Sequence, residues 1–244
     1  MNTTSESEDN NMMYGVAIGE KKKRIKLKDR VLPSYTKGEE IFNMVTHIVG
    51  GGVGILVSIA CIIVAALNQN TAGIITSTIF GTTMISLYTM SSIYHGLREG
   101  TAKKVFQIID HCTIYFLIAG TYTPLMVCSL AKTAPVNAWL TLGVVWAMAA
   151  LATTLTAIDL KKYKVFSNIC YVGMGWAVIF SMKETYHALG TAGFWLLLSG
   201  GLAYTVGVVF YALGKKIKYF HSIFHIFVLA GSVLQSLCII FYSL

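Results

Sequence analysis

Three histidines and one aspartate lie at the ends of long apolar runs, where ionisable side chains are rare. His221 and His225 are spaced i, i+4 and therefore share one face of a helix, one turn apart. Ser91 and His95 repeat that spacing in an earlier run, and Asp110 begins the run that follows. Ionisable residues at membrane depth are costly and are therefore candidates for function. The positions predict one polar site within an apolar protein.

The residue types in this set are those of a catalytic zinc site. Such a site uses three protein ligands and leaves one position for water, whose pKa falls to about 7. His95, His221 and His225 would be the ligands, although imidazole also suits iron, copper or nickel. Asp110 would hold the water, accept its proton or orient a ligand imidazole, and Ser91 would donate a hydrogen bond to water, a carboxylate or a substrate oxygen. Simpler roles stay open: interfacial histidines, helix packing for Ser91, and a favourable carboxylate at a helix N-terminus for Asp110.

A second polar stripe precedes this set. Glu40, Asn43 and His47 share one helical face at i, i+3 and i+7. They would support the ligands, contact a lipid headgroup or form a structural polar network. His111 points about 100° away from Asp110, so we leave it out of the site, and His187 receives no role.

The composition identifies the environment that must position these residues. Of the 244 residues, 55% are hydrophobic and only 12% are charged, and the mean hydropathy is +0.64, whereas a soluble domain carries about 25% charged residues. Each of seven apolar segments has the length of about 20 residues that a membrane-spanning helix needs. They cover residues 44–67, 72–94, 108–130, 136–157, 165–186, 193–213 and 221–243. The sequence therefore predicts an all-α integral membrane protein, a bundle of seven transmembrane helices.

The basic residues predict the orientation of this bundle. Of the 19 Lys and Arg residues, 17 fall in the N-terminal tail and in alternate loops, and only Lys132 and Lys183 fall on the other face. The positive-inside rule then predicts a cytoplasmic N-terminus, an external C-terminus and a multipass protein of the plasma (inner) membrane. This orientation uses no histidine, yet it brings all the candidate site residues to the cytoplasmic ends of their helices.

The polar N-terminal segment allows a division of the chain into two regions. Residues 1–37 predict a disordered, basic cytoplasmic tail without a cleavable signal peptide, and residues 38–244 the transmembrane domain. The basic stretch of the tail would rest on anionic lipids or act as an orientation signal. The net charge of +8 does not indicate nucleic acid, because the charges lie in the tail and loops. The five cysteines lie in apolar runs without a CxxC pair, so we expect them to pack as small hydrophobes.

The motifs resemble those of a known family. EEIFNMVTHIVGGG at 39–52, SSIYHG at 91–96 with DH at 110–111, and HSIFH at 221–225 are similar to the bacterial hemolysin III family, the prokaryotic branch of the progestin and adipoQ receptor family. The similarity runs from about residue 38 to the C-terminus. It implies a seven-helix bundle with zinc near the inner leaflet, ligated by His95, His221 and His225, with Asp110 holding the zinc-bound water and Ser91 in the same motif.

The resemblance also bears on function. The wider group of intramembrane metal hydrolases includes alkaline ceramidases, which implies hydrolysis of a lipid amide or ester and a role in membrane lipid homeostasis, with membrane lipids as substrate or ligand. The family name implies instead a pore-forming cytolysin, which fits a resident membrane topology less well, because a secreted toxin must be soluble before it inserts. A sensor of lipid state, using the same site without turnover, is the third interpretation.

Overall fold

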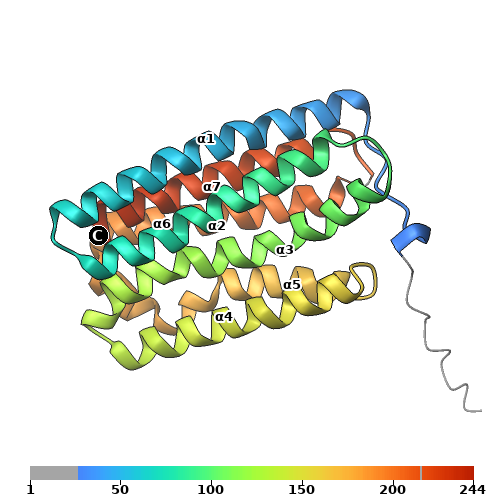
Figure 1. The fold of residues 1–244 in the computed structure, drawn as a ribbon. Helices are drawn as coiled ribbons and strands as arrows, with labels where there is room; N and C mark the ends of the chain where they lie inside the picture. Colours follow the sequence, from blue (N-terminus) through green and yellow to red (C-terminus); the bar gives the residue numbers. More distant parts are fainter. Residues whose placement is uncertain (1–26, 215) are drawn as a thin grey trace, which may run out of the picture.

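The computed structural model describes residues 27–214 and 216–244. Within these ranges the chain forms seven α-helices and no strand (Figure 1). The α-helices are α1 (Lys37–Leu67), α2 (Thr71–Gly96), α3 (Thr101–Pro124), α4 (Pro135–Ile158), α5 (Lys164–Gly175), α6 (Met182–Leu213) and α7 (Phe220–Tyr242). Short 3₁₀ segments are η2 (Leu27–Asp29), η4 (Leu130–Lys132) and η5 (Ala177–Ser181), and η3 (Leu125–Ser129) is π-helical.

The chain is an all-helical, multipass membrane protein. Among the described residues, five helical runs are long and apolar enough to cross a membrane: 37–67, 101–132, 135–158, 164–213 and 220–242. The Thr-, Ser- and Gly-rich helix α2 does not meet this criterion by itself, and α5, η5 and α6 count as one run of 50 residues. Gly190 interrupts that run with φ 67°, at the place where the sequence predicts the turn between the fifth and sixth spans.

Two of the predicted spans are less regular than expected. The fifth, predicted as a continuous helix over 165–186, is α-helical only to Gly175 and then passes through η5. The third changes from α-helix to π-helix directly after Pro124, because proline lacks the N–H that would continue the α-helical hydrogen bonds.

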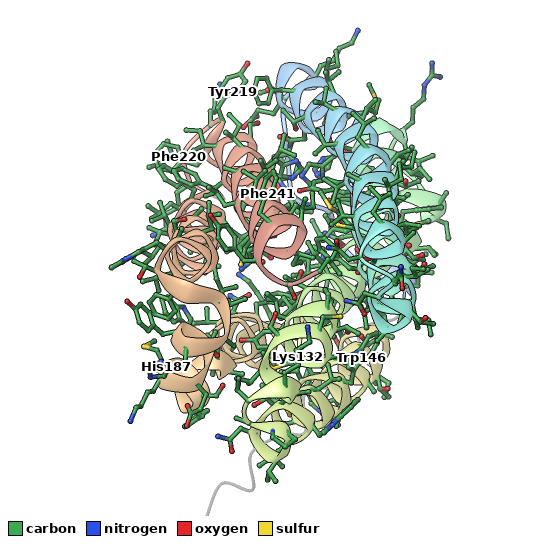
Figure 2. All side chains as sticks on the ribbon, turned by 90° about the vertical axis from the view of Figure 1, so that its left-hand side faces the viewer. Lys132, Trp146, His187, Tyr219, Phe220 and Phe241 are labelled. Carbon is green, nitrogen blue, oxygen red and sulfur yellow. The ribbon has the colours of Figure 1, made fainter. Side chains whose placement is uncertain are left out.

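The packing order brings together helices that are far apart in the sequence. α1 packs along both α2 and α7, α6 packs along α7, and α3 contacts α2, α4 and α5. Figure 2 shows this arrangement along the helix axes, with His187 at the outer rim. The starts of α1, α3 and α7 and the end of α2 lie at the same end of the bundle (Figure 1), so all of the candidate site residues lie within about three helical turns of that end.

Local sequence explains the helix starts and the close approach of α1 to α2. Thr36 and Glu39 form a reciprocal capping box at the start of α1, and the Asn70 side chain accepts the Gly73 N–H at the start of α2. Gly50 lies directly against the Tyr88 ring, where a Cβ would overlap ring carbons. Small residues at such points allow helix backbones in a membrane to approach closely.

The predicted tail extends into the described residues only at its end. Residues 1–26 lie outside the described ranges, and residues 27–36 lie against the bundle: η2 contacts α3, and the Tyr35 ring stacks on that of His221 at 5.0 Å between centroids. The division at residue 37 stays a prediction.

Candidate metal centre

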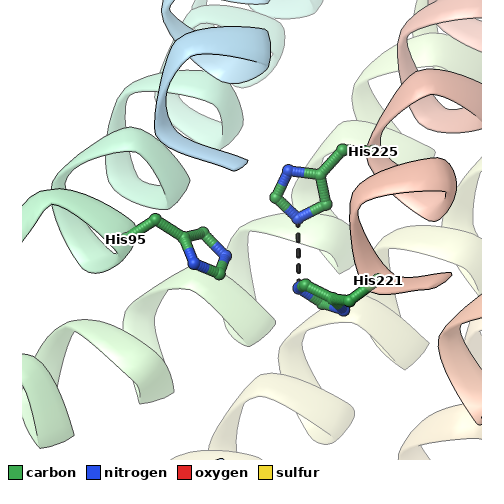
Figure 3. Close-up of side chains that lie close together, drawn as sticks. All are labelled: His95, His221 and His225. Carbon is green, nitrogen blue, oxygen red and sulfur yellow. Dashed lines mark hydrogen bonds between the residues drawn. The ribbon is translucent and has the colours of Figure 1, made fainter. Parts of the chain in front are cut away.

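Three buried histidines from two helices meet at one end of the bundle. His95 lies in the last turn of α2, His221 in the first turn of α7 and His225 one turn further along (Figure 3). Each offers a ring nitrogen, and these atoms all lie within 4.8 Å of one another. The cluster could hold a metal ion, as the sequence predicts, although 126 residues separate His95 from His221 in the chain.

One pair of ring nitrogens has the spacing expected of two ligands of one ion. The Nε2 atoms of His221 and His225 lie 3.1 Å apart, close to the edge of about 3.3 Å between two nitrogens of a tetrahedral site with bonds of about 2.0–2.1 Å. His95 Nδ1 is 2.7 Å from the Glu40 carboxylate, and its Nε2 is buried without a hydrogen-bond partner. Because a buried polar atom without a partner is costly, the His95 Nε2 fits a metal ligand.

Asp110 and Ser91 lie beside this cluster. Both line one cavity together with His221 and His225. Ser91 is buried one turn before His95 on α2, and an Asp110 carboxylate oxygen lies 3.7 Å from His111 Nδ1. The structure therefore brings the predicted ligands and their predicted helpers to one place, while their roles stay predictions.

The stripe of polar residues on α1 faces the same cluster. Glu40 contacts His95, the Asn43 Oδ1 accepts a hydrogen bond of 2.6 Å from Ser222, and the His47 ring stacks on His225 with 3.8 Å between centroids. Both ring nitrogens of His47 are buried and have no hydrogen-bond partner among the described residues. The structure thus brings the stripe against the histidines, and its role stays a prediction.

The cavity runs from the histidines into the apolar interior. Its walls come from α2, α3, α5, α6 and α7, and on α7 they extend from His221 to Gln235, roughly 20 Å at 1.5 Å per residue. Most of the lining is apolar, as in Leu117, Leu197, Val208 and Val228. The histidines thus form the polar end of a long, largely apolar cavity.

Several contributors to the site were not predicted. Lys103, which the loop charges had placed in a cytoplasmic loop, is buried in the first turn of α3 and lies 2.7 Å from Glu40 Oε1. Glu39 accepts the Tyr219 N–H at 2.7 Å. His111, expected outside the site, lines the cavity, but its nitrogens are engaged by the Gln107 carbonyl and the Tyr211 hydroxyl. No spacing in the sequence indicates these partners.

Tyr35, from the segment before α1, covers the cluster from the end of the bundle. Its ring lies 5.0 Å from that of His221 and 5.9 Å from that of His95, between centroids. Burial, with smaller contributions from Tyr211 and from the Glu40 and Asp110 carboxylates, raises the pKa of Tyr35. Its phenol therefore stays protonated near neutral pH.

Comparison with known proteins identifies sequences that are similar to this chain. A family model described as Haemolysin-III related matches residues 35–236. Hemolysin-3 of Bacillus cereus is 36% identical over 206 residues, which cover 84% of this chain and 92% of that protein. The Hemolysin-3 homolog of Bacillus subtilis (strain 168) is 39% identical over 212 residues (85% and 96%). The human Monocyte to macrophage differentiation factor is 32% identical over 170 residues (66% and 67%).

Proposed function

The chain belongs to the Haemolysin-III related family, and from this premise we propose that it is a resident plasma-membrane protein that hydrolyses a lipid amide or ester with a zinc ion. His95, His221 and His225 would hold the ion. One observation carries the proposal: three buried imidazoles lie together, and two of them, His221 and His225, line an apolar cavity that Asp110 and Ser91 also line.

We propose that the chain crosses the membrane seven times, with its N-terminus in the cytoplasm. A straight helix of 50 residues would be about 75 Å long, whereas the hydrocarbon core measures about 30 Å. The left-handed Gly190 within residues 164–213 therefore marks a reversal, and the run supplies two spans. α2 packs along α1 and α3 over its length, so it supplies another despite its lower hydropathy.

The cavity supports a lipid as substrate. Its length of roughly 20 Å exceeds one leaflet of a core about 30 Å thick, and apolar walls favour a hydrocarbon chain over a sugar or peptide. Because the histidines lie at its end near the basic loops, a lipid with its chain in the cavity would present its headgroup linkage to them.

The chain's own groups have distinct tasks in such a reaction. Zinc, when bound, would supply a water of lowered pKa as nucleophile and would polarise the substrate carbonyl. The Asp110 carboxylate would accept a proton from the attacking water and return it to the leaving amine or alcohol. Ser91 would donate a hydrogen bond to the substrate carbonyl oxygen, and Tyr35 would limit the entry of bulk water.

Two other functions use the same fold. The two Bacillus relatives carry the name Hemolysin-3, which favours a pore-forming cytolysin as the alternative. The cavity lining, however, is largely apolar and gives ions little to bind. A sensor would bind a lipid at the same site without turnover.

Metal content tests the proposal first. We expect the protein purified in detergent to contain about one zinc per chain by mass spectrometry, because three buried imidazoles face one point. His95→Ala, His221→Ala and His225→Ala should each lose it, while the exposed His187→Ala should retain it. The wild type should then release fatty acid from a panel of N-acyl and O-acyl lipids, and liquid chromatography would measure the fatty acid released.

The outcomes separate the candidate functions. Zinc with turnover supports the hydrolase. Tight lipid binding without turnover contradicts catalysis and favours the sensor. Ion flux through proteoliposomes that survives all three alanine variants would favour the pore. A wild-type protein that neither co-purifies with nor rebinds a metal would refute the metal site.

A further inference from the structure

We infer that two consecutive carboxylates on α1, Glu39 and Glu40, assemble the three-histidine cluster from its two halves: Glu40 fixes His95, and Glu39 fixes the start of α7. The inference rests on the proposed function, because it concerns how the same metal site is built. It assigns both residues, together with Lys103, as positioning residues rather than ligands.

The halves of the cluster come from helices that α1 joins. His95 ends α2, His221 and His225 begin α7, and α1 packs along both helices. The first turn of α1 lies at the same end of the bundle as these two helix ends (Figure 1). Side chains from that turn can therefore contact both halves at once.

Glu40 holds His95 through a fully engaged carboxylate. Its Oε2 lies 2.7 Å from His95 Nδ1, and its Oε1 lies 2.7 Å from the Lys103 ammonium. Lys103 is itself fixed, because it is buried, donates to the Leu97 carbonyl at 2.9 Å and lies over the Tyr94 ring. The carboxylate cannot turn away from His95 without leaving a buried cation unpaired.

This contact decides which nitrogen of His95 is available. A carboxylate only accepts, so His95 Nδ1 carries the proton of this contact, and in the neutral imidazole that can bind a metal the lone pair is then on Nε2. The Nε2 faces the cluster, is buried and has no hydrogen-bond partner. A carboxylate behind a ligand imidazole also raises its basicity toward a metal.

Glu39 acts on the other half through the backbone. Its Oε1 accepts the Tyr219 N–H at 2.7 Å, and its Oε2 accepts from the N–H and hydroxyl of Thr36 at 2.8 Å each. Tyr219 precedes α7 with φ 62°, a left-handed conformation that is unfavourable for a non-glycine residue. A charge-assisted hydrogen bond offsets that cost and so sets the direction in which α7, with His221, begins.

Metal affinity tests the role of Glu40. Metal-free protein would be titrated with Co²⁺ in detergent, with the visible absorption reporting the ligand geometry and Zn²⁺ competition the affinity. We expect Glu40→Gln to weaken binding about 10- to 100-fold and to change the spectrum. Lys103→Met should act in the same direction and Lys103→Arg should restore most of the affinity, while the exposed Glu99→Gln serves as the matched control.

The histidine tautomer tests the same role without any metal. In protein labelled with ¹⁵N-histidine, with His95→Ala for assignment, we expect His95 to be protonated at Nδ1 in the wild type and to lose this preference in Glu40→Gln. A variant that keeps wild-type affinity, spectrum and tautomer overturns the inference. If the wild type binds no metal, the proposed function fails, and the tautomer alone still decides whether Glu40 positions His95.

A double variant tests Glu39. Glu39→Gln should lower Co²⁺ affinity by about tenfold, since second-shell changes typically cost 10- to 100-fold. Glycine adopts positive φ freely, so adding Tyr219→Gly should recover affinity if Glu39 acts by holding this conformation. Equal loss in the single and double variants would overturn the role assigned to Glu39, as would a normal affinity in Glu39→Gln.

Discussion

At the scale of single residues, the proposed metal ligands and the proposed general base lie in different parts of the site. The three imidazoles face one another within 4.8 Å, whereas Asp110 lies on the cavity wall with a carboxylate oxygen 3.7 Å from His111. In the proposed function the histidines would hold the ion, and the Asp110 carboxylate on the cavity wall would transfer a proton to and from the substrate. Substitutions at the two kinds of position should therefore have different consequences.

Asp110→Asn provides that distinction. We expect zinc content to stay at the wild-type level, because the three imidazoles remain, and lipid hydrolysis to fall by about 10²- to 10⁴-fold, the usual contribution of a general base. Zinc per chain and initial rate would be measured on the same preparation, with Glu99→Gln as control. Loss of zinc from Asp110→Asn would show that the carboxylate is a ligand, and an unchanged rate would remove it from the mechanism.

At the scale of helices, α1 packs closely on α2 one turn deeper in the bundle than the polar cluster. Gly50 lies one turn along α1 from His47 and against the buried ring of Tyr88. Tyr88 also donates a hydrogen bond of 2.7 Å to Ser232 on α7. The three helices that carry the polar cluster are thus joined at this level, so a change in their spacing should be felt at the histidines.

Gly50→Ala tests this packing. A Cβ at this position would overlap the Tyr88 ring, and overpacking of this kind typically costs about 1–3 kcal/mol. We expect a lower thermal unfolding temperature in detergent and weaker Co²⁺ binding. Gly52→Ala is the matched control, since a Cβ at Gly52 meets nothing within 4 Å. Equal stability of the two variants would show that α1 and α2 have room to separate.

At the scale of the whole molecule, the number of crossings decides where the site lies. Hydropathy and length identify five candidate runs, whereas the reversal at Gly190 and the packing of α2 support seven. The two counts place different loops on each side of the membrane. They can be distinguished because the five cysteines are all buried, which favours a low background in thiol labelling.

Single added cysteines test the topology. With seven spans, Lys132→Cys and Thr191→Cys should react with a membrane-impermeant maleimide in intact cells, and Glu99→Cys only after lysis. All three positions are exposed. If α2 did not cross, Glu99→Cys would react in intact cells. If residues 164–213 crossed once, Thr191→Cys would lie within the membrane and would not react from outside.

The sequence by itself determined the class of protein, the approximate helices and the candidate ligands. These properties are local: hydropathy is summed over about 20 adjacent residues, charges are counted loop by loop, and the i, i+4 spacing of His221 and His225 fixes a shared face whatever surrounds it. The same local rules missed the 3₁₀ segment after α5, because a break inside an apolar run leaves the composition unchanged.

Only the tertiary structure decided which residues complete the site. Glu40 meets His95 across 55 positions, and Glu39 meets Tyr219 across 180, so neither contact has a periodic signature. The sequence alone indicates that Lys103 is a loop charge, whereas in the structure the first turn of α3 places its ammonium against Glu40. Which polar groups pair inside a membrane depends on which helices lie side by side, and that order results from the packing of all the helices together.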